Sequence, residues 1–325
     1  MTPASAQVFA YESLPGWAED DHLAALRSFR RTCDLMTDAD WTPVCRLAAN
    51  VPDTDSAARQ FFERLFKPIL IGTPPALFTG YYEPELAGSP SRTRRFAWPI
   101  YRRPPELRDG VVWYDRATIE RGILRGRELE IVWLDDPVEV FFLHIQGSGR
   151  IHLPDGRVIR VGYAGRNGHA YHSVGQELIS RGILTAAQVS AESIRAYVRA
   201  NPALGTQLLN LNPSYVFFRK LADLPDTQGP IGTMGRSITT LRSVAIDPDH
   251  IRLGTPIWVE KAGPDPIHRL MIAQDTGGAI KGAQRADIFF GTGTVAGRAA
   301  GTIRDGGRLF SLVPNDRAYA LSADG

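Results

Sequence analysis

The sequence predicts a mainly β fold with peripheral helices, organised as two β-rich units. Beyond residue 76, short apolar runs alternate with glycine, proline and aspartate turns, the pattern of proteins built from many short strands. The clearest helical spacing of apolar residues lies nearer the N-terminus. With 325 residues, the chain is long enough for two domains of roughly 150 residues each.

The N-terminal region predicts two packing helices followed by a strand. Apolar side chains fall on one helical face over residues 18–36 and again over 56–67. Residues 76–84 change character to an aromatic strand, which Pro84 ends because proline cannot donate to a sheet. We expect the two helices to cover a sheet elsewhere in the chain.

The middle of the chain, residues 98–223, predicts a separate β-rich unit. Its predicted strands are WPIYRRP (98–104), GVVWYDR (110–116), EIVWLDD (130–136), VEVFFLHIQGSGRI (138–151) and RVIRVGYAGRNG (157–168). Asp155-Gly156 between two alternating runs predicts a hairpin. Helical patterns interrupt the strands over 118–125 and within 173–199. Such closely spaced strands indicate a small barrel or sandwich.

The last hundred residues predict one compact β-barrel. Its predicted strands are 237–247, 255–260, 268–275, 286–291 and 308–313. The sequence contains no internal repeat with a period of 20 to 50 residues. The N-terminal helices are predicted to pack on this barrel.

Composition and charge exclude several functional classes. The chain carries 37 basic and 35 acidic residues and no basic block interleaved with aromatics, so we expect no nucleic-acid partner. Its apolar runs are shorter than the roughly 18 residues of a membrane helix, and residues 1–7 lack the basic start and apolar centre of a secretory signal. No phosphate loop or dinucleotide fingerprint occurs. His169 and His172 lack accompanying ligands, so neither a metal site nor a cofactor is predicted.

Two acids surround a glycine-rich turn in residues 271–293, the stretch with the strongest catalytic signal. Asp275 ends an apolar run and Asp287 follows 12 positions later, with Gly277 and Gly278 between them. For an isolated Asp-Thr-Gly-Gly, turn capping is the commoner role. A third acid, Asp247, also ends an apolar strand, where Asp-Pro favours a turn. If these strand ends converge, repulsion between the carboxylates raises the pKa of at least one of the three aspartates. That aspartate could then act as a general acid near neutral pH.

Aromatic and glycine-rich positions suggest where a ligand lies. Residues 146–149, comprising Gln146, Gly147, Ser148 and Gly149, predict a loop that approaches a ligand closely and offers hydrogen-bond donors. Rings occur near strand ends and glycines at Tyr81, Tyr82, Tyr101, Tyr163, Tyr171, Tyr215, Phe217 and Phe218. Such rings can pack on sugar faces, although a barrel core with tyrosines at its rim explains any single one equally well. His144 is predicted to be a core histidine in an apolar strand.

Several stretches together resemble the membrane-bound lytic transglycosylase A family, and they follow the family's order over most of the chain. They are FTGYYEP (78–84), HIQGSG (144–149), GYAGRNG (162–168), NPSYVFF (212–218), GRS (235–237) and residues 275–291. The C-terminal part also resembles the three-aspartate domain, whose name fits Asp247, Asp275 and Asp287.

The resemblance implies a double-psi β-barrel built from residues 1–97 and 225–325, with a smaller β-barrel domain, residues 98–224, inserted and a groove between them. It implies cleavage of the MurNAc–GlcNAc β-1,4 bond of peptidoglycan without water, leaving a 1,6-anhydro-MurNAc end. Asp287 corresponds to the catalytic aspartate and Asp275 to its neighbouring acid. The substrate-binding residues we predict are Tyr81, Tyr82, Gln146, Gly147, Ser148, Gly149, Tyr163, Asn167, Tyr215, Asp247, Gly277 and Gly278. The expected partner is the peptidoglycan glycan strand, and the expected protein is an exported monomer of the periplasm or the periplasmic face of the outer membrane.

The chemistry is consistent with a single acid. Hydrolytic glycosidases use two carboxylates, one of which activates water or attacks the sugar. A transglycosylase uses the C6 hydroxyl of its own substrate as the nucleophile. Asp287 would therefore protonate the glycosidic oxygen and afterwards accept the C6 hydroxyl proton. Asp275 would orient Asp287 and tune its pKa.

Two other functions and one pairing stay open in the sequence. Asp275-Thr276-Gly277 matches the aspartic-protease triplet, but such a protease needs two triplets, so this chain would have to dimerise. A non-catalytic peptidoglycan-binding module is the other alternative. Cys33 and Cys45 suit either a disulfide or two free thiols, with the disulfide favoured by their proximity and by the resemblance to exported enzymes. The sequence departs from the family in showing no N-terminal lipid-anchoring cysteine.

Overall fold

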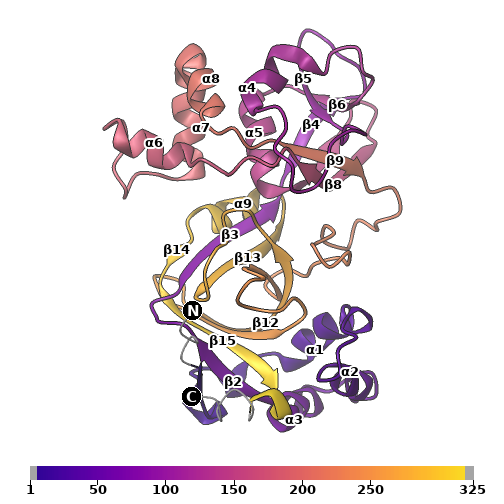
Figure 1. Cartoon of the computed structure of the whole chain (residues 1–325), viewed down its shortest axis with the longest axis vertical. Coiled ribbons are helices and arrows are strands. Elements are labelled where there is room, and N and C mark those ends of the chain that lie inside the picture. The colour runs from indigo at the N-terminus through magenta and orange to yellow at the C-terminus, as the bar shows by residue number, and fades with distance from the viewer. Residues whose placement is uncertain (1–5, 319–325) are drawn as a thin grey trace. The chain divides into compact units, whose positions relative to one another are not determined.

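A computed structural model describes residues 6–318 and has a sheet-rich fold with helices (Figure 1). The described residues form two compact units. Unit 1 takes its residues from Met1–Tyr81, Ile231–Gly291 and Ile303–Gly325, and unit 2 from Tyr82–Pro230 and Thr292–Thr302. The predicted mainly β fold with helices is confirmed. Most of the N-terminal segment searched for a secretory signal lies outside the described residues.

Unit 1 is built on a sheet of nine described strands in the order β1-β2-β15-β11-β12-β10-β13-β3-β14. They are β1 (Ala6–Val8), β2 (Phe66–Ile71), β3 (Leu77–Glu83), β10 (Ser243–Ile246), β11 (Pro256–Lys261), β12 (Ile267–Thr276), β13 (Arg285–Thr292), β14 (Arg304–Asp305) and β15 (Gly307–Pro314). Strands from the two ends of the chain are neighbours, because β15 pairs antiparallel with β2. Strand β10 lies between β12, to which it is parallel, and β13, to which it is antiparallel. Of the predicted strand 237–247, only the part in β10 is a strand.

Helices near the N-terminus cover part of this sheet. They are the 3₁₀ turns η1 (Tyr11–Ser13), η2 (Trp17–Glu19) and η3 (Cys33–Leu35) and the helices α1 (His22–Arg30), α2 (Thr42–Ala48) and α3 (Asp55–Leu65). Asp21 and Thr54 cap α1 and α3 by accepting hydrogen bonds from Ala24 N and Ala57 N. Phe29 and Phe62 of these helices pack into one core with Trp258 and Phe310 of the sheet. The helices predicted over 18–36 and 56–67 are thus confirmed as packing helices.

A disulfide joins Cys33 in η3 to Cys45 in α2. The favoured pairing is therefore confirmed, and it holds two short elements together on the helical side of unit 1. None of the helices within residues 6–318 has both the length and the apolar character needed to cross a membrane.

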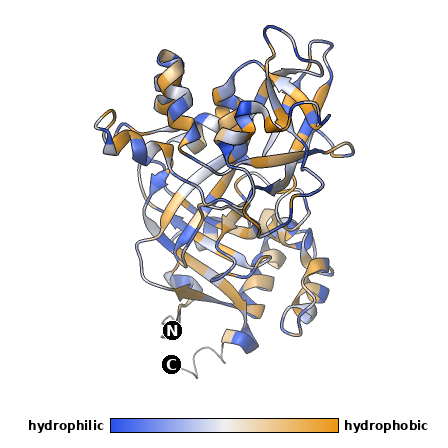
Figure 2. Cartoon of the chain, turned by 45° about the horizontal axis from the view of Figure 1, so that its top comes forward, coloured by the Kyte–Doolittle hydropathy of each residue, from blue (hydrophilic) through white to orange (hydrophobic). Residues whose placement is uncertain are grey.

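Unit 2 contains a second sheet with the strand order β5-β6-β4-β7-β8-β9. Its strands are β4 (Glu85–Ser89), β5 (Trp98–Tyr101), β6 (Glu130–Leu134), β7 (Ser148–His152), β8 (Val158–Arg166) and β9 (Val216–Lys220). Its helices are α4 (Arg116–Thr118), the π-helical turn η4 (Ile119–Ile123), α5 (Pro137–Gln146), α6 (Val174–Ser180), α7 (Ala191–Ala200), α8 (Pro202–Asn210) and α9 (Gly293–Gly301). Strands β7 and β8 pair antiparallel across the turn containing Asp155-Gly156, which confirms the predicted hairpin. Figure 2 shows hydrophobic and hydrophilic residues interspersed along the strands, helices and loops.

Two predicted strands of unit 2 are wrong. Residues 110–115 form a turn and loop rather than a strand, and Arg116 begins helix α4. The first part of 138–151 is helix α5, so His144 lies in a helix. Asp136 caps this helix by accepting from Val138 N (2.8 Å), Pro137 opens it and Gly147, with φ +76°, ends it. The helix is buried on several sides, so its apolar run lacks the polar face that distinguishes a surface helix from a buried strand.

Candidate active site

Asp275 and Asp287 lie in one cross-strand row of the unit 1 sheet. Ala245 of β10 is the register partner of Asp275 on β12 and also of Asp287 on β13. Register partners project from the same face of a sheet, and adjacent strands are about 4.8 Å apart, so the two aspartate Cα atoms are separated by roughly 10 Å. The Ala245 side chain between them is buried and packs in the apolar cluster described below. The sheet therefore brings the two acids together, although 12 positions separate them in sequence.

The Asp275 carboxylate accepts four hydrogen bonds. Its Oδ1 accepts from Thr233 N (2.9 Å), Thr233 Oγ1 (2.8 Å) and Thr276 N (2.9 Å), and its Oδ2 accepts from Tyr81 OH (2.9 Å). Burial raises the pKa of Asp275, whereas these hydrogen bonds oppose the rise because they stabilise the carboxylate. Asp275 is thus held by four donors in one orientation.

Asp287 receives far less support. Among the described residues, its hydrogen-bond partner is Thr79, whose Oγ1 donates to Oδ1 (2.5 Å). Burial raises the pKa of Asp287 to about 6, opposed by the Thr79 hydrogen bond and by Arg285 and assisted by the negative charge of Asp275. Asp287 is partly accessible despite the crowding by protein atoms. An accessible carboxyl group with a pKa near 6 suits a general acid at neutral pH.

Arg285 and Thr79 form a second layer beside Asp287. Arg285 Nη2 donates to Thr79 Oγ1 (2.8 Å), and Nη1 donates to Leu77 O (3.2 Å) and Ala286 O (2.7 Å). Thr79 lies on β3, the neighbour of β13 in the sheet (Figure 1). The guanidinium group therefore links the two strands next to the acid.

An apolar cluster lies beside the acids and supports them. Tyr81, Ala245 and Phe289 pack there with the buried Ile238 and Ile280. Burial raises the pKa of the Tyr81 hydroxyl well above its usual value, so it remains a donor to Asp275. Ile280 belongs to the glycine-rich turn, where a Cβ on Gly277 would lie 2.8 Å from Ile280 Cγ1. Gly277 thus allows tight packing of the turn, whereas Gly278 is exposed.

Asp247 stabilises the other end of that turn. Its carboxylate accepts from Lys281 Nζ (2.9 Å), Gly282 N (2.8 Å) and Asp249 N (3.3 Å). Burial alone would raise the pKa of Asp247, but the Gly282 N–H and the Lys281 ammonium outweigh it and lower the pKa. The geometry thus gives Asp247 a role in holding the turn, with its oxygens directed at protein donors.

The loop predicted over residues 146–149 is wrong for three of its four residues. Gln146 ends helix α5, Ser148 and Gly149 begin strand β7, and only Gly147 connects the two elements in unit 2. Gln146 Oε1 accepts from Tyr82 N (2.9 Å), so this side chain is fixed to the strand that carries Tyr82. Gly149 is required by packing, since a Cβ there would lie 2.7 Å from Leu143 Cδ1. Ser148 is buried in β7. Nothing lies within 4 Å of the position of a Cβ on Gly147, so this glycine borders open space.

The other three predicted binding residues of unit 2 differ in exposure. Tyr163 is 49% exposed and free to contact a ligand. Asn167 is fully buried, and its amide donates to Tyr114 O and Pro213 O and accepts from Tyr215 N. Tyr215 is buried too, with its ring 4.2 Å from that of His144. Asn167 and Tyr215 therefore organise the loops from within the fold.

Sequence reasoning did not single out Thr79, Arg285 or Thr233 as site residues. Thr79 lies in the FTGYYEP stretch, in which Tyr81 and Tyr82 were the residues predicted to bind substrate. Thr233 reaches Asp275 from 42 positions away and carries no motif that links the two. Gly232 was likewise not identified from the sequence. It allows close packing beside the site, because a Cβ there would lie 2.8 Å from Gln274 O. No group of three or more His, Cys, Asp or Glu residues in the described part of the chain is arranged to hold a metal ion.

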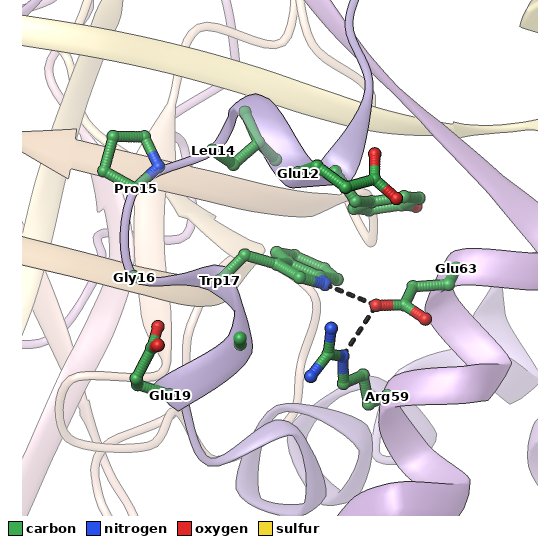
Figure 3. A pocket seen from close by; sticks show the side chains of 10 residues that line it. Glu12, Leu14, Pro15, Gly16, Trp17, Glu19, Arg59 and Glu63 are labelled. Atoms are coloured by element: carbon green, nitrogen blue, oxygen red, sulfur yellow. Dashed lines mark hydrogen bonds and ion pairs between the residues drawn. The ribbon is translucent and has the colours of Figure 1, made fainter.

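A separate hollow of about 310 Å³ lies in the N-terminal part of unit 1 (Figure 3). Trp17, Arg59 and Glu63 line it, and Glu63 Oε1 accepts from both Trp17 Nε1 (2.9 Å) and Arg59 Nε (2.7 Å). None of the predicted site residues lines this hollow. The polar groups at its centre form hydrogen bonds with one another. We therefore take the row of Asp275 and Asp287 as the candidate active site.

Comparisons with known proteins agree with this geometry. Residues 77–219 match the family described as the MltA specific insert domain, and residues 242–313 match the 3D domain. The membrane-bound lytic murein transglycosylase A of Vibrio cholerae is 35% identical over 250 residues, which cover 73% of this chain and 65% of that protein. The chain thus spans about two thirds of the length of this relative.

Solved structures extend the similarity to nearly the whole chain. The crystal structure of a membrane-bound lytic murein transglycosylase from Agrobacterium tumefaciens aligns with a TM-score of 0.90 and 32% identity, covering 98% of this chain and 99% of that one. Escherichia coli MltA with bound chitohexaose aligns with a TM-score of 0.72 and 30% identity, covering 97% and 93%. Sequence, sheet architecture and the arrangement of the acids thus lead to one assignment: the chain belongs to the membrane-bound lytic murein transglycosylase A family.

Proposed function

We propose that this protein is a lytic transglycosylase that cleaves the MurNAc–GlcNAc β-1,4 bond of peptidoglycan and leaves a 1,6-anhydro-MurNAc end. The unequal surroundings of the two acids carry this proposal. Both acids are partly accessible, but Asp275 is fixed by four donors, whereas Asp287 accepts from Thr79 alone among the described residues and has a pKa raised to about 6. One acid is thus suited to proton transfer and the other to support.

In this mechanism Asp287 acts twice. Protonated at rest, it donates its proton to the glycosidic oxygen as the bond to the leaving sugar breaks. The resulting carboxylate then accepts the proton of the C6 hydroxyl as that oxygen bonds to C1 of the same MurNAc residue. No water enters the product, so a second carboxylate to activate water is unnecessary. The nearby charge of Asp275 favours the protonated form of Asp287 at the start.

The glycan strand is the proposed ligand, supported by the chitohexaose bound in the Escherichia coli relative. In unit 2, the exposed Tyr163 ring and the open space at Gly147 favour direct contact with sugar. In unit 1, Gly278 is exposed and is proposed to contact sugar as well. Tyr82 and Gln146 are mutually fixed at the surface of unit 2 and are proposed to contribute to binding as a pair. We assign Tyr215, Asn167 and Asp247 to supporting the binding loops.

The finer architecture and location form part of the proposal. The order of the unit 1 strands, with β10 parallel to β12 and antiparallel to β13, supports a double-psi β-barrel, and the unit 2 sheet supports a smaller inserted barrel. The names of the relatives support an exported protein that works in the periplasm or at the outer membrane.

Digestion of purified peptidoglycan sacculi tests the activity. The wild-type protein is expected to release muropeptides with 1,6-anhydro ends, identified by mass spectrometry. Asp287→Asn should lower the rate by about 10²-fold to 10⁴-fold, the usual contribution of general acid–base catalysis, while still binding glycan strands. Asp265→Asn, which changes an exposed aspartate in the β11–β12 connection, is the matched control and should retain full activity.

Each alternative product pattern refutes a specific part of the proposal. Products with reducing ends alone would identify a hydrolase. Glycan binding without any product would indicate a non-catalytic wall-binding module. Full activity in Asp287→Asn would remove this residue from the mechanism.

A further inference from the structure

We propose that Arg285 is a positioning residue that acts through Thr79 to determine which oxygen of Asp287 carries the catalytic proton. The inference deepens the proposed function and rests on it. It starts from three atoms in sequence: Arg285 Nη2 lies 2.8 Å from Thr79 Oγ1, which lies 2.5 Å from Asp287 Oδ1.

The direction of these two hydrogen bonds follows from the chemistry of the groups. A guanidinium group has only donors, so Thr79 must accept from Arg285. The single hydroxyl hydrogen of Thr79 is then available for Asp287 and is directed at Oδ1. While this bond persists, Oδ1 is an acceptor and the proton of the acid resides on Oδ2. Without Arg285, the hydroxyl could rotate and present a lone pair to the acid instead.

The position of Arg285 suits this role. Arg285 and Asp287 are two residues apart on β13, so their side chains project from the same face. Two backbone carbonyls, Leu77 O and Ala286 O, accept from Nη1 and fix the guanidinium plane. Among the described residues, the acid whose charge acts on the pKa of Arg285 is Asp287. The charge therefore acts on Asp287 from a fixed place.

The other titratable groups that face Asp287 are Asp275 on β12 and the Tyr81 hydroxyl on β3. Asp275 raises the pKa of Asp287, whereas Arg285 and the Thr79 hydrogen bond lower it. Tyr81 remains protonated because burial raises its pKa. Arg285 is thus the positive group that offsets Asp275, and its removal should make Asp287 release its proton at higher pH.

The pH dependence of kcat/KM on sacculi separates positioning from a structural role. Activity requires protonated Asp287 in the free enzyme, so the rate falls as pH rises through its pKa. Arg285→Gln is expected to move this alkaline limb upward by roughly one pH unit and to lower the maximal rate. Arg285→Lys keeps the charge but cannot reproduce the planar fork, so the limb should stay in place while the maximal rate falls. Thr79→Val should move the limb upward, and Thr79→Ser should restore it.

Arg304→Gln is the matched control. Arg304 is exposed on β14 and is the register partner of Thr79 on the edge of β3 away from β13. Solvent screens its charge, and it is not among the groups that shift the pKa of Asp287, so this change removes a nearby positive charge but leaves the Arg285–Thr79–Asp287 hydrogen bonds in place. Its pH profile should match that of the wild type. Circular dichroism and thermal unfolding of each variant separate a loss of fold from a loss of positioning. An unchanged limb in folded Arg285→Gln would overturn the proposal.

A second measurement distinguishes failure of this inference from failure of the proposed function. Titration of the Asp287 carboxyl by carbon-13 NMR, assigned with Asp287→Asn, reports its pKa without any substrate. A higher pKa in Arg285→Gln than in the wild type supports the inference even if the sacculi are not cleaved. Equal pKa values in both proteins would refute it even if the transglycosylase activity is established.

Discussion

Asp275 and Asp287 differ in how strongly their surroundings stabilise the ionised carboxylate. Four donors stabilise Asp275 as a carboxylate, and one stabilises Asp287. The negative charge of Asp275 also raises the pKa of Asp287. Each residue thus depends on the other, as is usual where two acids share one site and divide the roles of charge and proton donor.

Removal of the Asp275 charge should therefore shift the pH profile in the direction opposite to removal of Arg285. In Asp275→Asn, Asp287 loses a nearby negative charge and its pKa falls, so the alkaline limb of kcat/KM should move downward by roughly one pH unit. Asp249→Asn, at an exposed acid beside the glycine-rich turn, should leave the limb in place. An upward shift in Asp275→Asn would contradict the electrostatic coupling described above.

At the same scale, the sequence identified the acids but not their supports. Asp275 and Asp287 stand out because they end apolar segments beside glycines. Thr233 and Thr79 are ordinary residues in sequence, and they become important only because the fold places their hydroxyl groups within 2.8 Å and 2.5 Å of a carboxylate. Such contacts depend on tertiary structure and leave no periodic or motif signal.

Among the elements, the turn before α1 anchors the N-terminal helices to the sheet. Asp20, next to η2, is buried and accepts from both terminal nitrogens of Arg242 (2.8 and 2.9 Å) and from Leu270 N of β12 (2.8 Å). Arg242 precedes β10 and donates to Leu270 O as well (2.8 Å). One buried ion pair thus links residues 222 positions apart and connects the helical layer to the strands of the active site.

Breaking this pair should destabilise the fold. Asp20→Ala leaves the buried guanidinium of Arg242 without its carboxylate, and we expect a loss of about 3 to 5 kcal/mol in the free energy of unfolding, as is usual when one partner of a buried pair is removed. Urea unfolding monitored by circular dichroism measures it. Glu106→Ala, which breaks the solvent-exposed pair with Arg127, should change the urea midpoint little. Equal effects of the two changes would show that burial does not govern the strength of the Asp20 contact.

Element prediction succeeded where one face is polar and failed where it is not. Helix α3 pairs buried Phe61 and Phe62 with an exposed polar side, so helical spacing revealed it. Most side chains of helix α5 are buried, so its run VEVFFLHIQ has no wide polar face and its pattern predicts a strand. The signals that identify this helix are local ones, Asp136-Pro137 at its start and Gly147 at its end.

For the whole molecule, the order of the strands could not be read from spacing alone. The unit 1 sheet places β15 next to β2 and β3 next to β13, although each pair is drawn from distant parts of the chain. Hydrophobic alternation predicts that a segment is a strand but does not predict its neighbours. The pairing of β10 with both β12 and β13 creates the row of Asp275, Ala245 and Asp287. The neighbouring position of β3 and β13 then brings Thr79 to Asp287, so the site depends on the strand order of the sheet.

The sheet maintains this site at a cost to the stability of the protein. The unfolded chain has the ordinary aspartate pKa of 3.8, whereas the folded protein raises the pKa of Asp287 to about 6. Since the folded state then binds the proton more tightly, this residue contributes stability that is fully present below pH 3.8 and is lost as pH rises through 6. A difference of roughly two pKa units corresponds to about 2 to 3 kcal/mol.

Asp287→Asn should therefore be more stable than the wild type at pH 8, by up to about 2 to 3 kcal/mol, although we expect it to be much less active. The amide carries no charge to be buried, and its oxygen can still accept from Thr79. The advantage should shrink as pH falls below 6 and disappear near pH 3.8, where the wild-type carboxyl is protonated in both states. Urea unfolding of both proteins from pH 4 to pH 8 measures the difference, in which the titration of groups that are not coupled to Asp287, such as His144, largely cancels. A difference that stays constant with pH would show that the raised pKa of Asp287 is not what opposes folding.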